Sequence, residues 1–188
     1  MTSVAIAQKN KIHPHKFTLW VAIGSILMMF AGLTSAYIVK RNQANWTSFE
    51  IPLMFWISTA VMVVSSLTII AANKAFKERA IGKYRSLMMA TMVLGVLFIV
   101  LQVIGFKQLW DIGLTLQKNV AYSFLYVIVG LHALHVIGGV IALMVMAIKA
   151  FSNKTRVYSA VPLEVMSTYW HFVDVLWIYL LIFLVLIK

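Results

Sequence analysis

The chain has 188 residues, of which 62% are hydrophobic and only 11% are charged, and its mean hydropathy is +0.92. Soluble domains are about 45–50% apolar and 25% charged, so this composition excludes a water-soluble globule and predicts an integral membrane protein. The net charge of +11 does not indicate nucleic-acid binding, because the basic residues lie in short connections between apolar segments. The absence of cysteine excludes disulfides and thiolate-bound metal.

Five apolar segments follow one another along the chain, each long enough to cross a hydrocarbon core of about 30 Å. Backbone groups in hydrocarbon must be hydrogen-bonded internally, and no segment alternates as a barrel strand does, so all five are expected to be helices. Pro52 and Pro162 stand at or just before helix starts, where a missing N–H costs little. The sequence predicts an all-α bundle forming one membrane domain over residues 1–188, with transmembrane helices at about 17–39, 52–72, 86–106, 120–148 and 165–187.

The distribution of Lys and Arg predicts the orientation of the bundle. Eleven of these residues fall in the N-terminal tail and in the second-to-third and fourth-to-fifth connections, against five on the other side. The positive-inside rule then places the N-terminus in the cytoplasm and the C-terminus outside. The first apolar segment is too long for a signal-peptide core, so it is interpreted as a retained anchor.

The fourth segment carries two histidines, His132 and His135, three residues apart, with Gly139 four residues further on. At 100° per residue these three positions share one face of a helix. Small residues on such a face let a neighbouring helix approach closely. The glycines expected to serve helix packing are Gly130, Gly138 and Gly139.

The fifth segment carries Ser167, His171 and Asp174 on one face. Inserting an aspartate in the middle of a bilayer costs about 2.5–3.5 kcal/mol of free energy, so such a residue is expected to have a polar partner or a functional role. Since helices joined by a short loop are antiparallel neighbours, the polar faces of the fourth and fifth helices are expected to meet. We therefore predict that Asp174 contacts His132 or His135.

Three interpretations of His132, His135, His171 and Asp174 remain open from the residues alone. They are polar groups satisfied inside the bundle, or ligands of a metal in a membrane enzyme, or a proton relay in a small transporter or channel. The first is favoured, because a metal site needs three or four ligands and HxxH supplies two; no metal and no catalytic residue is predicted.

Residues near the span ends are candidates for contact with the membrane interface. Tryptophan is typical of this level of the bilayer, and basic residues there attract anionic headgroups at about 1 kcal/mol each. The candidates are Trp20, Trp170, Lys83 and Arg85.

Three segments of the sequence resemble subunit III of the haem–copper terminal oxidases, cytochrome c oxidase in particular, in its short five-helix bacterial form. The similar segments are GLHALHVIGG at 130–139, YWHFVDVLW at 169–177 and IGSILMMFAGLTSAYIV at 23–39. One departure is Ile26, which stands where many members carry a glutamate, so no role of that carboxylate is carried over.

The resemblance implies a multi-pass subunit of a bacterial inner-membrane respiratory complex, with no redox centre of its own. Haems and copper would belong to partner subunits I and II, which reduce oxygen to water and pump protons in aerobic respiration. This chain would stabilise subunit I, hold structural phospholipid and support proton uptake. Whether the complex belongs to a larger respiratory supercomplex is left open. A quinol oxidase has a similar third subunit, so the electron donor, cytochrome c or quinol, is also open.

Overall fold

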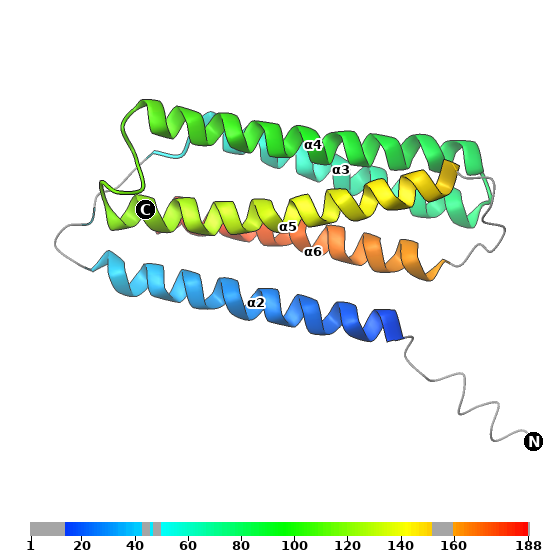
Figure 1. The fold of residues 1–188 in the computed structure, drawn as a ribbon, viewed down its shortest axis with the longest axis horizontal. Coiled ribbons are helices and arrows are strands. Elements are labelled where there is room, and N and C mark those ends of the chain that lie inside the picture. The colour runs from blue at the N-terminus through cyan, green and yellow to red at the C-terminus, as the bar shows by residue number, and fades with distance from the viewer. Residues whose placement is uncertain (1–13, 43–45, 47–49, 152–159, 188) are drawn as a thin grey trace, which may run out of the picture.

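The computed structural model describes residues 14–42, 46, 50–151 and 160–187. It confirms the all-α architecture: five long apolar helices run nearly parallel to one axis, and each is long and apolar enough to cross a membrane (Figure 1). The helices are α2 (Pro14–Arg41), α3 (Leu53–Lys77), α4 (Ile81–Asp111), α5 (Val120–Phe151) and α6 (Val161–Leu186). Five of the Lys and Arg residues counted for the orientation lie outside the described residues: Lys9, Lys11, Lys154, Arg156 and Lys188.

Most helices extend beyond the predicted spans. α4 begins at Ile81 instead of 86 and ends at Asp111 instead of 106, which makes it 31 residues long. At 1.5 Å per residue that is about 46 Å, more than the hydrocarbon core alone requires. Hydropathy predicts only the part of each helix that lies in the hydrocarbon core. The backbone hydrogen bonds of the helix continue beyond that part until the chain turns. Both prolines are where the sequence placed them, Pro52 as the N-cap of α3 and Pro162 in the first turn of α6.

Four of the helices form a closed bundle, and α2 lies outside it. α3 and α4 form the most extensive contact, α4 packs on α5, α5 on α6, and α6 on α3. Among the described residues α2 contacts only α5 and α6, so it lies along one edge of the molecule (Figure 1). α6 is the most enclosed of the five helices.

The outward surface is apolar. Large hydrophobic side chains are exposed on every helix, Met28 at 79% and Val175 at 64% among them. Buried polar side chains instead gather inside the bundle, as expected for a protein whose solvent is hydrocarbon.

The predicted orientation is testable with cysteine labelling, because the chain has no cysteine of its own. Lys83 and Lys118 are exposed at opposite ends of the bundle. If the N-terminus is cytoplasmic, a membrane-impermeant maleimide added to intact cells will label the Lys118→Cys variant. It will label the Lys83→Cys variant only after permeabilisation. The reverse pattern would contradict the orientation.

Candidate functional site

The candidate site lies where α6 crosses the centre of the bundle. Trp170, Asp174 and Trp177 follow at i, i+4 and i+7 and therefore share one face of α6, with His171 beside them. All three are buried, and His171 is half-buried. This face points toward α3, α4 and α5, so α6 carries both the polar groups and the largest core side chains to the bundle centre.

Asp174 lies near the middle of α6, about 20 Å along the helix from its start, and is 5% exposed. Its carboxylate lies beside the hydroxyl of Ser66 of α3, close enough for a hydrogen bond. The Ser66 hydroxyl also lies 2.5 Å from Nδ1 of His171. A hydroxyl has one hydrogen, so Ser66 serves both residues by donating to one and accepting from the other. His171, Ser66 and Asp174 thus form one polar link between α6 and α3, in which Oδ1 of Asp174 has no hydrogen-bond partner.

The predicted contact between Asp174 and a histidine of α5 is wrong. His132 is completely buried, and neither of its ring nitrogens has a hydrogen-bond partner. Its ring stacks on Trp177 with centroids 5.0 Å apart and meets the edge or face of Phe98 at 6.0 Å. The Nδ1 atom of His135 lies 2.7 Å from the carbonyl oxygen of Leu131 in its own helix. Asp174 turns toward α3, so the α5 histidines meet aromatic rings and backbone instead.

A row of hydroxyls on α3, which was not among the predicted site residues, receives the polar groups of α6. Nε1 of Trp170 donates to Ser65 at 3.1 Å, and Nε1 of Trp177 donates to Thr59 at 2.9 Å. Ser58 on the same helix accepts from Gln102 of α4 at 2.8 Å. The signal was present as paired hydroxyl residues seven positions apart, which places them on one helix face: Ser58-Thr59 and Ser65-Ser66.

The indole of Trp170 fills the space between two glycines on facing helices. A Cβ atom at Gly95 of α4 would come within 2.8 Å of Trp170 Cη2, and one at Gly139 of α5 within 2.9 Å of Cζ3. Trp170 is 0% exposed, so its assignment to the membrane interface is wrong. The physical reason is the gap that the two missing side chains leave, which is wide enough for an indole at the bundle centre.

Only one of the three predicted packing glycines is at a close approach. Gly139 contacts Trp170 as described, whereas a Cβ at Gly130 or Gly138 would meet nothing within 4 Å. Close packing at Gly130 and Gly138 is therefore wrong for this chain; Gly138 borders an open hollow between α2, α5 and α6 instead.

The three remaining interface candidates lie in different surroundings. Trp20 is 63% exposed near the start of α2, and Lys83 is exposed near the start of α4. Arg85 is half-buried, with Nε donating to the carbonyl oxygen of Ala150 at 2.7 Å and its guanidinium 5.3 Å from the Phe151 ring centre. Arg85 therefore caps the C-terminal turn of α5, where a cation is favoured.

In the part of the chain that the structure describes, no three His, Asp or Glu side chains come together as metal ligands would. What the arrangement does chemically is keep an acid, a histidine and two indole N–H groups hydrogen-bonded inside a hydrocarbon solvent. Each unpartnered polar group there costs several kcal/mol, so these contacts fix how α6 sits against α3.

The chain matches one known protein family over most of its length. The family model described as "Cytochrome c oxidase subunit III" matches residues 42–187. The chain belongs to the cytochrome c oxidase subunit III family. The match includes α3 to α6 and therefore Ser66, His171 and Asp174.

Bacterial members of the subunit III family are similar over nearly their whole length. The chain is 31% identical to cytochrome c oxidase subunit 3 of Corynebacterium diphtheriae, over 97% of each chain. It is 29% identical to cytochrome c oxidase subunit 3 of Bacillus subtilis, over 94% of this chain and 86% of the relative. With five membrane-spanning helices and such relatives, it is a multi-pass protein of a bacterial inner membrane.

As a member of the subunit III family, the chain is part of an oxidoreductase complex with other oxidase subunits. Ile26, which stands where the sequence analysis expected many members to carry a glutamate, lies on α2 and is partly buried against the core. An aliphatic side chain packs there without a polar partner.

We expect the contact between Trp170 and Gly139 to be sensitive to a single methyl group. The Gly139→Ala variant will lose about 1–3 kcal/mol of stability, because the rigid indole is held between two helices and cannot move aside. The Gly138→Ala variant is the matched control and will be neutral or more stable, since alanine favours a helix by about 1 kcal/mol. Thermal loss of the helical circular-dichroism signal in detergent measures both; equal midpoints would contradict the contact.

We expect the Ser66→Ala variant to be destabilised by about 1–3 kcal/mol, because it leaves both Asp174 and His171 without their shared partner. Ser25→Ala is the control, since that hydroxyl is exposed and bonds only to the carbonyl of Val21 in its own helix. Denaturation in mixed micelles gives the two free energies of unfolding. A Ser66→Ala value no lower than that of the control would show that the link does not stabilise the bundle.

Proposed function

We propose that this chain is the non-redox subunit III of a proton-pumping cytochrome c oxidase, in which it stabilises subunit I, holds structural phospholipid and supports proton uptake while oxygen is reduced to water. The observation that carries the proposal is the family match over residues 42–187, which includes the whole four-helix bundle and its polar link. Haem and copper are expected in the partner subunits I and II.

The surroundings of the buried histidines support a role as a scaffold. His132 is enclosed by aromatic rings, and His135 is bound to a backbone carbonyl of its own helix. His171 and Asp174 are tied to Ser66. These groups thus serve packing: His171 and Asp174 link α6 to α3, His132 packs among aromatic rings from other helices, and His135 bonds within its own helix.

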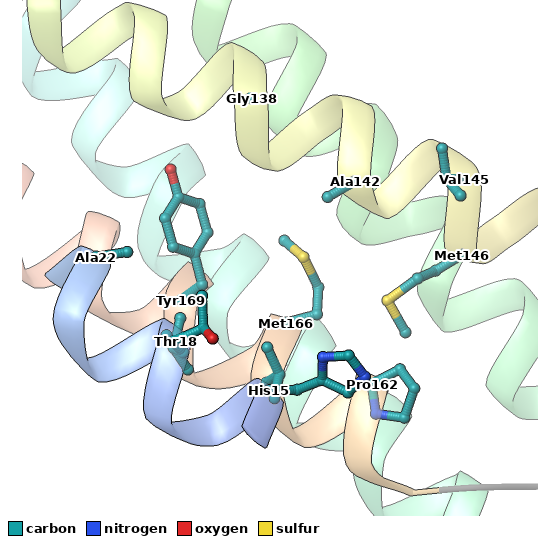
Figure 2. Close-up of a pocket in the computed structure, with 12 residues that line it drawn as sticks. His15, Thr18, Ala22, Gly138, Ala142, Val145, Met146, Pro162, Met166 and Tyr169 are labelled. Carbon is teal, nitrogen blue, oxygen red and sulfur yellow. The ribbon is translucent and has the colours of Figure 1, made fainter. Parts of the chain in front are cut away.

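A cavity between α2, α5 and α6 supports the binding of phospholipid chains. It has a volume of about 750 Å³ and opens where α2 diverges from α5 (Figure 2). Ala142, Met146 and Met166 line it, and Tyr169 stands at one end with its hydroxyl donating to the carbonyl of His135 at 3.0 Å. Methionine is flexible and polarizable, so this lining adapts to an acyl chain.

The exposed apolar faces support attachment to other membrane subunits. α2 has contacts on one side only, and Leu27, Met28 and Val39 are among its exposed side chains. A helix so weakly held by its own chain is suited to packing between this bundle and subunit I. As for the electron donor, the relatives compared are named as subunits of cytochrome c oxidase, which supports cytochrome c over quinol.

Co-purification tests the proposal. An affinity-tagged chain, extracted in mild detergent from cells that express the oxidase, will bring along a haem absorbance spectrum, and the chain expressed alone will show none. The Asp174→Asn variant will retain less haem per chain, because it perturbs the link that positions α6. Asp111→Asn, at the exposed end of α4, is the control.

Two other outcomes would replace the proposal. Stoichiometric zinc or iron in the chain purified alone would favour a membrane metalloenzyme. Proton flux into liposomes that contain only this chain, abolished by Asp174→Asn, would favour a proton channel.

A further inference from the structure

A second groove follows the contact between α2 and α6, on the side toward α3. Its outer part, about 390 Å³, lies among the first turns of α2 and α6 and the last turns of α3. Its inner part, about 330 Å³, lies further along α2 and α6. Asn73 and Lys77 of α3 line only the outer part, which therefore lies between α2, α3 and α6, whereas the inner part is lined by α2 and α6.

The outer and inner parts are two separate hollows, but the same helix faces line both, so they lie in line along the contact between α2 and α6. On α6, Glu164, Thr168 and His171 line the outer part, and Val175 and Tyr179 line the inner part. Their spacing of four, three, four and four residues keeps them on one face, and Thr168 and Tyr179 lie about 16 Å apart along the helix. The lining residues of α2 follow in the same way: Lys16, Trp20, Leu27 and Ala31.

The outer part is polar and carries an excess of positive charge. Lys16 and Lys77 both line it, and Lys16 Nζ lies 2.8 Å from a carboxylate oxygen of Glu164. These three groups leave a net charge of about +1. Beside the largely apolar Leu19, Trp20 and Val165, four further hydrogen-bonding side chains line it: Asn73, Ser167, Thr168 and His171.

The inner part is apolar. Phe30 of α2 and Phe172 and Leu176 of α6 form its walls. Tyr179 brings the one polar group, and its hydroxyl is directed to Thr34 at 3.4 Å. Exposed Leu27 and Val175 stand at the rim, where they would face the bilayer.

We propose that this groove binds one anionic glycerophospholipid, with its singly charged phosphodiester among Lys16, Lys77 and Thr168 and an acyl chain along Phe30 and Val175. A polar outer part and an apolar inner part match the headgroup and the acyl chain of a phospholipid. Free phosphate would occupy only the outer part, and a partner helix would be apolar along the whole contact. The basic end of the bundle is also the end at which anionic lipid is attracted. The inference rests on the proposed lipid-binding function and gives that function a headgroup class and a place.

The test uses the intact oxidase complex containing this chain, stripped of loosely held lipid and titrated with phosphatidylglycerol or phosphatidylcholine of the same chain length. Native mass spectrometry counts the bound lipid. Phosphatidylglycerol will bind more tightly, and Lys77→Gln will weaken it about fivefold, as expected for one lysine near a headgroup. Lys83→Gln, an exposed lysine at the same end but outside the groove, will leave it unchanged.

A second pair of variants examines the inner part. Ala31→Phe fills it and will reduce the binding of both lipids, whereas Ala36→Phe, exposed on another face of α2, will not. Equal affinity for the two lipids, equal effects of Lys77→Gln and Lys83→Gln, or displacement of phosphatidylglycerol by inorganic phosphate would each overturn the inference. So would an Ala31→Phe variant that binds lipid normally but loses partner subunits, because a protein segment would then fill the groove. Haem absorbance of the same preparations tests the subunit role separately.

Discussion

The packing of Trp170 between Gly95 and Gly139 is the contact on which the bundle depends. α4 and α6 are diagonal partners whose backbones do not contact each other, so it is the indole that connects them. Its Nε1 atom donates a hydrogen bond to Ser65, which brings α3 into the same contact. One side chain thereby fixes the separation of α3, α4, α5 and α6. In hydrocarbon no water is expelled when helices meet, so this kind of close steric fit and hydrogen bonding must hold the helices together.

The polar groups of α6 follow from the same geometry. Once Trp170 faces the centre, the positions one and two turns on, Asp174 and Trp177, face it too. α3 meets them with small neutral hydroxyls instead of charges, and these can donate and accept without a charge of their own to desolvate. This explains how an acid is accommodated at the bundle centre without an ion pair, and why His132 is left to stack on Trp177.

The position of α2 outside the bundle connects the fold to the proposed role. The four-helix bundle holds the polar link of Ser66, His171 and Asp174 at its centre, whereas α2 leaves an apolar cavity toward α5 on one side and a groove toward α3 on the other. The residues that line each opening follow one another along the helices, as the contacts of an acyl chain there would. A subunit that carries lipid in its seams and no redox group of its own would act on the oxidase by holding neighbouring helices and lipids in place.

The sequence alone determined the class of protein, the number and order of helices and the two segments that carry intramembrane polar residues. Composition and apolar length fix these, because hydrocarbon admits few other structures. The family was also evident from the YWHFVDVLW segment. Only the tertiary structure decided the partners of the polar residues. Asp174, predicted to contact a histidine of α5, lies beside Ser66 of α3. Trp170, predicted to lie at the membrane interface, packs between two glycines. Helical periodicity tells which residues share a face, but the rotation of each helix about its own axis is set by the packing of all the others. A sequence read one helix at a time does not contain that rotation.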